Sequence, residues 1–119
     1  MRIIDLFSGC GGLSLGFMKD GHTVLRALEY DAEIAKTYKL NHPEVDVIVD
    51  DIKNVDTTNV FSGGDADIII GGPPCQGFSV SGKRLIDDPR NVLYKSFVEY
   101  VGEIQAKVFQ EYKGLYGKE

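Results

Sequence analysis

A cysteine placed directly after two prolines, at the end of an apolar run, could present a thiol for nucleophilic chemistry. The run Asp67–Ile70 predicts a buried strand, and Gly71-Gly72-Pro73-Pro74-Cys75-Gln76 follows it. Because proline fixes φ and cannot donate to a ladder, the chain should leave the sheet there in a stiff turn. Ligands bind at this carboxyl end of the strands in open α/β sheets. Cys75 is therefore a candidate nucleophile, although an isolated cysteine is more often a buried structural residue.

A glycine-rich turn near the N-terminus suits a nucleotide cofactor. Ser8-Gly9-Cys10-Gly11-Gly12 lies between an expected strand, Arg2–Phe7, and an expected helix, Leu13–Asp20, with Gly21 as its C-terminal stop. Glycines let the backbone approach a ligand, and a helix N-terminus offers free N–H groups. Gly9-x-Gly11 begins the dinucleotide fingerprint, but Ser14 stands at its third glycine position. On this match alone, an ordinary tight turn is nearly as good an interpretation.

An acidic residue strengthens the cofactor interpretation. Glu29 ends the next expected strand, His22–Glu29, and follows Gly9 by 20 positions (29 − 9 = 20). This is about the ~20-residue spacing at which a carboxylate meets ribose hydroxyls. A solvated acid at a strand end is the alternative.

The remaining elements alternate between strand and helix. In chain order we expect a helix at Ala32–Leu40, strands at Val45–Val49 and Ala66–Gly71, a helix at Val92–Ile104 and a strand at Lys107–Tyr112. Asp31 is a suitable N-cap for the helix at Ala32–Leu40. The alternation of strands and helices predicts an α/β fold with a mostly parallel, Rossmann-like sheet and flanking helices.

Composition limits the classes of function. The chain has 119 residues, which suits one small domain, and no apolar run is long enough to span a membrane. Cys10 and Cys75 form no Cys-x-x-Cys pair, so neither a zinc site nor a disulfide framework is expected, and the cytoplasm is the expected compartment. His22 and His42 have no partner motif and are expected at the surface. The net charge of −5 argues against this chain gripping DNA alone.

Two motifs resemble one family. Gly72-Pro73-Pro74-Cys75-Gln76-Gly77-Phe78-Ser79 is similar to the catalytic-cysteine motif of the C5-cytosine DNA methyltransferases, in their bacterial, restriction–modification form. Asp5-Leu6-Phe7-Ser8-Gly9-Cys10-Gly11-Gly12-Leu13-Ser14 resembles their first motif. The resemblance implies transfer of a methyl group from S-adenosylmethionine (SAM) to C5 of a flipped cytosine in double-stranded DNA. Cys75 would form the covalent adduct, and no metal is implied.

The resemblance also implies cofactor contacts. Glu29 would hold the ribose, Tyr30 and Ile52 would pack on the adenine, and Asp51 would meet its amino group. Tyr30 could equally be a core residue, and Asp51 could simply cap a turn. The full set of implied SAM residues is Phe7, Gly9, Gly11, Glu29, Tyr30, Asp51, Ile52, Pro73 and Leu93, the last of which could also be plain core.

DNA contacts are implied in and after the cysteine motif. Residues 80–91 form a polar stretch long enough to suggest a functional loop, although an ordinary solvated loop fits equally well. Glu111 is the candidate acid for cytosine N3, but the family's Asn-Val after that acid is absent, so it could be an ordinary strand glutamate. The implied DNA-contacting residues are Gln76, Ser79, Ser81, Lys83 and Arg84.

The resemblance covers residues 1 to about 109 and only the N-terminal part of a complete family member. We therefore expect a partial SAM-binding and catalytic domain over residues 1–119, without a target-recognition domain. A second polypeptide or self-association could complete the fold. The alternatives are an inactive SAM-binding or interaction module, and a nicotinamide-dependent oxidoreductase. The incomplete fingerprint and the Pro-Pro-Cys-Gln turn disfavour the oxidoreductase.

Overall fold

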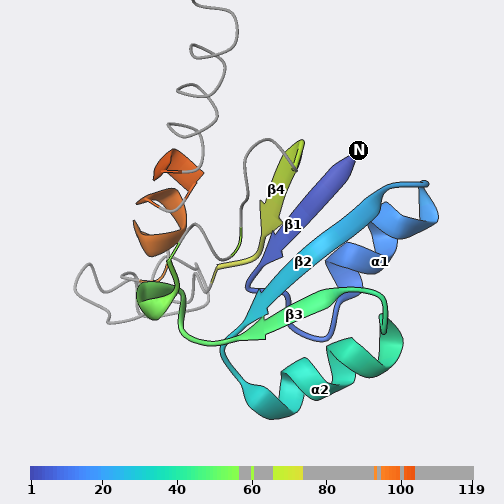
Figure 1. The fold of residues 1–119 in the computed structure, drawn as a ribbon, viewed down its shortest axis with the longest axis horizontal. Coiled ribbons are helices and arrows are strands. Elements are labelled where there is room, and N and C mark those ends of the chain that lie inside the picture. The colour runs from blue at the N-terminus through green and yellow to red at the C-terminus, as the bar shows by residue number, and fades with distance from the viewer. Residues whose placement is uncertain (57–59, 61–65, 74–92, 94, 100, 104–119) are drawn as a thin grey trace, which may run out of the picture.

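The computed structural model describes residues 1–56, 60, 66–73, 93, 95–99 and 101–103. These residues form parallel strands and helices that alternate along the chain, as the sequence predicts (Figure 1). Residues 93, 95–99 and 101–103 are helical, within the helix expected after residue 91. The strand expected at 107–112 lies outside the described residues. The elements in chain order are β1 Arg2–Leu6, α1 Gly12–Lys19, β2 Thr23–Glu29, α2 Ala32–Asn41, β3 Asp46–Val49, η1 Ile52–Asn54 and β4 Ile68–Gly71.

The four described strands form one parallel sheet in the order β3-β2-β1-β4. The chain moves from β1 to β2 to β3 in one direction and then crosses back, so that β4 pairs with the other side of β1 (Figure 1). The strand order therefore reverses between β1 and β4. In open α/β sheets, ligands bind at such a reversal, outside the carboxyl ends of the strands.

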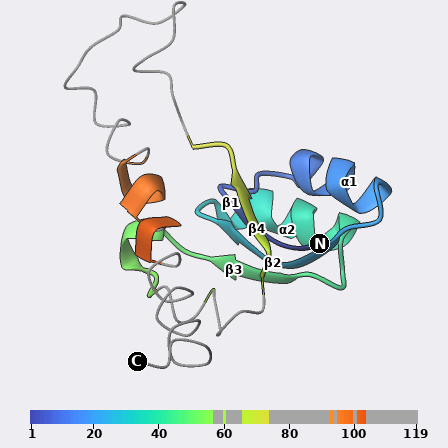
Figure 2. The ribbon, with the colours of Figure 1, turned by 90° about the horizontal axis from the view of Figure 1, so that it is seen from above.

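Side chains alternate between the two faces of β1 and so define two hydrophobic cores. Ile3 belongs to the core that also contains Tyr38 of α2, whereas Ile4 and Leu6 belong to the opposite core, with Val60. Helices α1 and α2 cover the first face, while η1 and the helical residues 93, 95–99 and 101–103 lie toward the second (Figure 2). The fold class predicted from the sequence is confirmed.

The helix ends have the chemistry predicted for them. Asp31 caps α2, because its Oδ1 accepts hydrogen bonds from the backbone N–H groups of Glu33 (2.9 Å) and Ile34 (3.2 Å). Helix α1 ends before Gly21, whose φ of 86° lies in the left-handed region that favours glycine.

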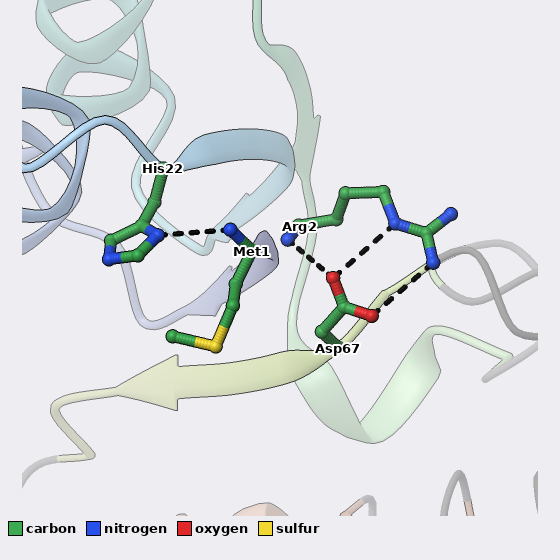
Figure 3. Close-up of polar contacts among 4 residues, drawn as sticks. All are labelled: Met1, Arg2, His22 and Asp67. Carbon is green, nitrogen blue, oxygen red and sulfur yellow. Dashed lines mark hydrogen bonds and ion pairs between the residues drawn. The ribbon is translucent and has the colours of Figure 1, made fainter.

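Arg2 and Asp67 join the amino ends of β1 and β4, at the edge opposite the glycine turn (Figure 3). The Arg2 backbone N–H donates to Asp67 Oδ2 (2.8 Å), and its guanidinium pairs with Oδ1 at 3.3 Å. These hydrogen bonds hold the pKa of Asp67 below its ordinary value, and the one from the Arg2 backbone N–H has the largest effect. Beside them, His22 Nδ1 lies 3.0 Å from the Met1 ammonium and Nε2 lies 3.2 Å from Asp20 Oδ2. His22 is also half-buried, so it is not the plain surface residue that the sequence predicts.

Within the part of the chain that the structure describes, no helix is long and apolar enough to cross a membrane.

Candidate functional site

The glycine turn after β1 has an unusual backbone. Phe7, Gly9 and Gly11 all have positive φ, at 56°, 58° and 94°. Phe7 is the non-glycine residue among them, and a bulky side chain in this region stores about 1–3 kcal/mol of strain. The turn is closed by the Gly11 N–H, which donates to the Ser8 carbonyl (3.1 Å). Strain of this kind clusters at ligand sites.

Backbone hydrogen bonds hold the turn against the carboxyl ends of the neighbouring strands. The Ser8 N–H donates to the Leu28 carbonyl (3.0 Å), which places the turn beside Glu29, the last residue of β2. The Asp50 N–H donates to the Glu29 carbonyl (3.1 Å), so the residues after β3 reach the same place. The glycine turn, Glu29 and the Asp50-Asp51 pair therefore share one edge of the sheet.

The exposure of this edge suits a nucleoside ligand. Glu29 is half-buried, and the next residue, Tyr30, is 73% exposed. The alternative that Tyr30 is a core residue is thus wrong. A Cβ placed on Gly9 would meet nothing within 4 Å, so the backbone of the turn is open to a ligand there. A carboxylate for hydroxyl groups, an uncovered aromatic ring and an accessible glycine backbone form a donor and acceptor set that fits SAM.

Asp51 and Ile52 each have a structural task in addition to any ligand contact. Asp51 caps η1, since its Oδ1 accepts from the Lys53 N–H (2.9 Å), and its Oδ2 lies 3.5 Å from Lys53 Nζ. This is the turn-capping role that the sequence left open. Ile52 is 6% exposed and belongs to the hydrophobic core with Leu28. The adenine contacts of both residues stay predictions.

The carboxyl end of β4 lies directly beside the glycine turn. Leu6 and Gly71 are register partners, so the chain that leads to Pro73 departs from the sheet next to Phe7. The rings of Phe7 and Phe97 lie 6.2 Å apart between centroids. Leu93 is half-buried and packs against the core that contains Ile4 and Leu6. This is the core position that the sequence left open for it. Pro73 is half-buried.

The predicted catalytic and DNA-contacting residues lie outside the described residues, so their roles stay predictions. They are Cys75, Gln76, Ser79, Ser81, Lys83, Arg84 and Glu111. Among the described residues, no group of three His, Cys, Asp or Glu side chains could hold a metal ion.

A buried polar cluster beneath the glycine turn was not predicted from the sequence. Asp5 is 1% exposed, and its Oδ2 accepts a hydrogen bond from the Ser14 hydroxyl (2.5 Å), which lies 2.8 Å from the Tyr38 hydroxyl. Burial raises the pKa of Asp5 to about 6, although the Ser14 hydrogen bond opposes this change. Burial likewise raises the pKa of Tyr38 to about 12. A signal was available, because Asp5 is a charged residue inside the apolar run Ile3–Leu6.

The expectation that His42 lies at the surface is wrong. His42 is 5% exposed, and its ring packs on Tyr38 with the two centroids 5.0 Å apart. Both rings support the glycine turn from below, because a Cβ on Gly11 would lie 2.8 Å from His42 ring atoms and 2.9 Å from the Tyr38 ring. Gly11 is therefore required by close packing as well as by its positive φ.

Comparison with known proteins agrees with this architecture. Residues 1–110 match the family of C-5 cytosine-specific DNA methylases, and the chain belongs to that family. It is 49% identical over 110 residues to the type II methyltransferase M.DdeI of Desulfomicrobium norvegicum, covering 92% of this chain and 26% of the relative. It is 41% identical to M.AgeI of Thalassovita gelatinovora, covering 92% of this chain and 27% of that protein.

A similar solved structure extends the agreement to the fold. It is a protein interpreted as a DNA modification methyltransferase encoded within an E. coli prophage, with a TM-score of 0.71 and 41% identity. The match covers 88% of this chain and 29% of that one. The chain thus spans between a quarter and a third of the length of these relatives.

Proposed function

We propose that this chain is the SAM-binding and thiol-bearing part of a DNA (cytosine-5)-methyltransferase. The supporting observation is that the glycine turn, Glu29 and the end of β4 meet at one edge of the sheet, at the strand-order reversal. The sequence places Cys75 two positions after Pro73, the last described residue of that strand end. Cofactor and nucleophile would then lie at the same edge.

The geometry of this edge supports the proposed cofactor contacts. The open backbone at Gly9 and the carboxylate of Glu29 would hold the amino-acid and ribose parts, and the exposed Tyr30 ring would stack on adenine. SAM would supply the transferable methyl group. Phe7, Gly11, Asp51, Ile52, Pro73 and Leu93 complete the proposed set.

The thiol of Cys75 would provide covalent catalysis. Its thiolate adds to cytosine C6, which makes C5 electron-rich enough to accept the methyl group. Loss of the C5 proton and departure of the thiolate then restore the aromatic ring. A thiolate suits both steps, because it is a good nucleophile and a good leaving group near neutral pH. Glu111 is the proposed hydrogen-bonding partner for N3.

The target cytosine must be extruded from the DNA duplex to reach the thiol, at a cost of a few kcal/mol for unstacking. Gln76, Ser79, Ser81, Lys83 and Arg84 are the proposed contacts to the DNA. Because the net charge is −5, stable DNA binding is expected to need a further polypeptide, supplied in cis, in trans or by self-association.

Calorimetric titration of SAM into the purified chain tests the proposal. We expect binding that is lost in Glu29→Ala and kept in Glu33→Ala, which removes an exposed carboxylate from α2. Thermal unfolding of all three proteins would show that each is folded. A folded wild-type chain that does not bind SAM would contradict the proposal and favour an inactive module of the same family.

A further inference from the structure

A buried chain of hydrogen bonds connects three elements beneath the glycine turn. Asp5 lies on β1, Ser14 on α1 and Tyr38 on α2, and all three are at most 1% exposed. Ser14 is the central member, with its Oγ 2.5 Å from Asp5 Oδ2 and 2.8 Å from the Tyr38 hydroxyl.

The chemistry of the hydroxyl groups fixes the direction of this chain when Asp5 is ionised. A carboxylate only accepts, and a serine hydroxyl has a single proton to donate. Ser14 therefore donates to Asp5, and Tyr38 must donate to Ser14. When Asp5 is protonated, its own O–H can donate to Ser14, and the order reverses. Ser14 and Tyr38 are thus coupled to each other and to the charge of Asp5.

The same residues touch the glycine turn. Ser14 is the third residue of α1, and the Leu15 N–H donates to the carbonyl of Gly11, the N-cap of that helix. The rings of Tyr38 and His42 occupy the space under Gly11. A change in the position of Tyr38 or Ser14 would consequently move both the end of the turn and the start of α1.

We propose that Ser14 and Tyr38 are positioning residues that hold the glycine turn in its ligand-binding conformation, so that cofactor affinity depends on helix α2. This inference rests on the proposed SAM site. Ser14 stands where a dinucleotide fingerprint has its third glycine. A glycine there would allow close packing of helix and strand, whereas serine also ties α1 to β1 and α2. A turn held in advance binds more tightly, because less ordering is needed at binding.

The test is SAM calorimetry on the wild type, Ser14→Ala, Tyr38→Phe and the double variant. Tyr38→Phe removes one buried hydrogen bond and should weaken binding about tenfold, a change of about 1.4 kcal/mol. Ser14→Ala removes both hydrogen bonds of Ser14 and should weaken binding at least as much. The double variant should be weaker by clearly less than the product of the two effects, because both single variants remove the Ser14–Tyr38 hydrogen bond. Thr37→Val, which deletes an exposed hydroxyl from the same helix, should bind as the wild type does.

A pH profile separates positioning from a purely structural role. Four polar or titratable side chains face Asp5 from the neighbouring elements. They are Ser14 of α1, Tyr38 of α2, His42 at the C-terminal end of α2, and Glu29 of β2. Because Ser14 lowers the pKa of Asp5, Ser14→Ala should move the pH dependence of SAM affinity to higher pH. A structural role would lower the melting temperature and leave the profile in place.

The outcomes are distinct. A wild type that binds SAM, together with folded variants of unchanged affinity, overturns the positioning role and leaves the proposed function standing. A folded wild type that does not bind overturns both. If Ser14→Ala fails to fold, Tyr38→Phe decides, since it removes a single oxygen atom.

Discussion

Leu6 and Gly71 are register partners at the carboxyl ends of β1 and β4, and the carbonyl of Leu6 fills the space that a side chain at Gly71 would need. A Cβ at Gly71 would lie 2.6 Å from that oxygen and 2.6 Å from Cε2 of Phe97. Glycine thus lets β1, β4 and the ring of Phe97 close together at the point where the chain leaves the sheet toward Pro73.

Gly71→Ala should destabilise the chain by about 1–3 kcal/mol, because backbone and ring must both shift to admit the methyl group. Gly72→Ala is the matched control, since a Cβ there meets nothing within 4 Å. Urea unfolding of the two variants and the wild type measures the difference. Equal stability of the two variants would show that the β1–β4 junction is looser than its geometry indicates.

Gly11→Ala should reduce both stability and SAM affinity. The residue has a φ of 94°, and the added methyl group would meet the rings of His42 and Tyr38. We expect a loss of about 1–3 kcal/mol in the free energy of unfolding. Gly16→Ala is the opposite case, because it lies inside α1 with open space around it, and it should stabilise the chain by about 0.5–1 kcal/mol. Thermal unfolding and SAM titration of both variants check this contrast.

Asp5 should make the chain less stable as the pH rises from about 4 to about 6. Burial raises its pKa in the folded state from the ordinary 3.8 to about 6, so the folded chain binds more protons than the unfolded chain in this window. The contribution is fully present below pH 4 and is lost above pH 6, and amounts to about 3 kcal/mol.

Asp5→Asn isolates this effect, since asparagine has no charge to bury. The stability of Asp5→Asn relative to the wild type should improve by about 3 kcal/mol between pH 4 and pH 7. Denaturant titrations at several pH values give the comparison. A constant difference between the two proteins would mean that Asp5 does not titrate in this window.

The sequence predicted the elements well, because their signals are local. Asp31 marks the start of α2, Gly21 marks the end of α1, and the apolar runs mark the strands. Glu29 was found from its spacing to Gly9, and the structure places it beside the turn. Such features depend on residues close in the chain and need no knowledge of packing.

The cluster of Asp5, Ser14 and Tyr38 under the glycine turn was not predicted, because it forms only when three elements pack together. Tyr38 lies on the buried face of α2 with Ala35, but no local pattern says that its hydroxyl meets Ser14, 24 positions away. His42 follows α2 in a turn-like Asn-His-Pro sequence, which favours the surface, and only the packing of α2 against the turn buries it.

Asp67 should give a pH dependence of the opposite sign from that of Asp5. Its hydrogen bonds to the Arg2 backbone and guanidinium lower its pKa in the folded chain, so the stabilisation is present above its unfolded pKa and is lost as the pH falls through the lowered value. Asp67→Asn should therefore be less stable than the wild type at pH 7, and the two should converge in strong acid. Because the pair is half-exposed, the difference should also shrink at high salt. Unfolding midpoints of both proteins at pH 7 and in acid, at low and high salt, decide the matter. A gap that stays the same in acid would show that the Asp67 carboxylate is not what joins β1 to β4.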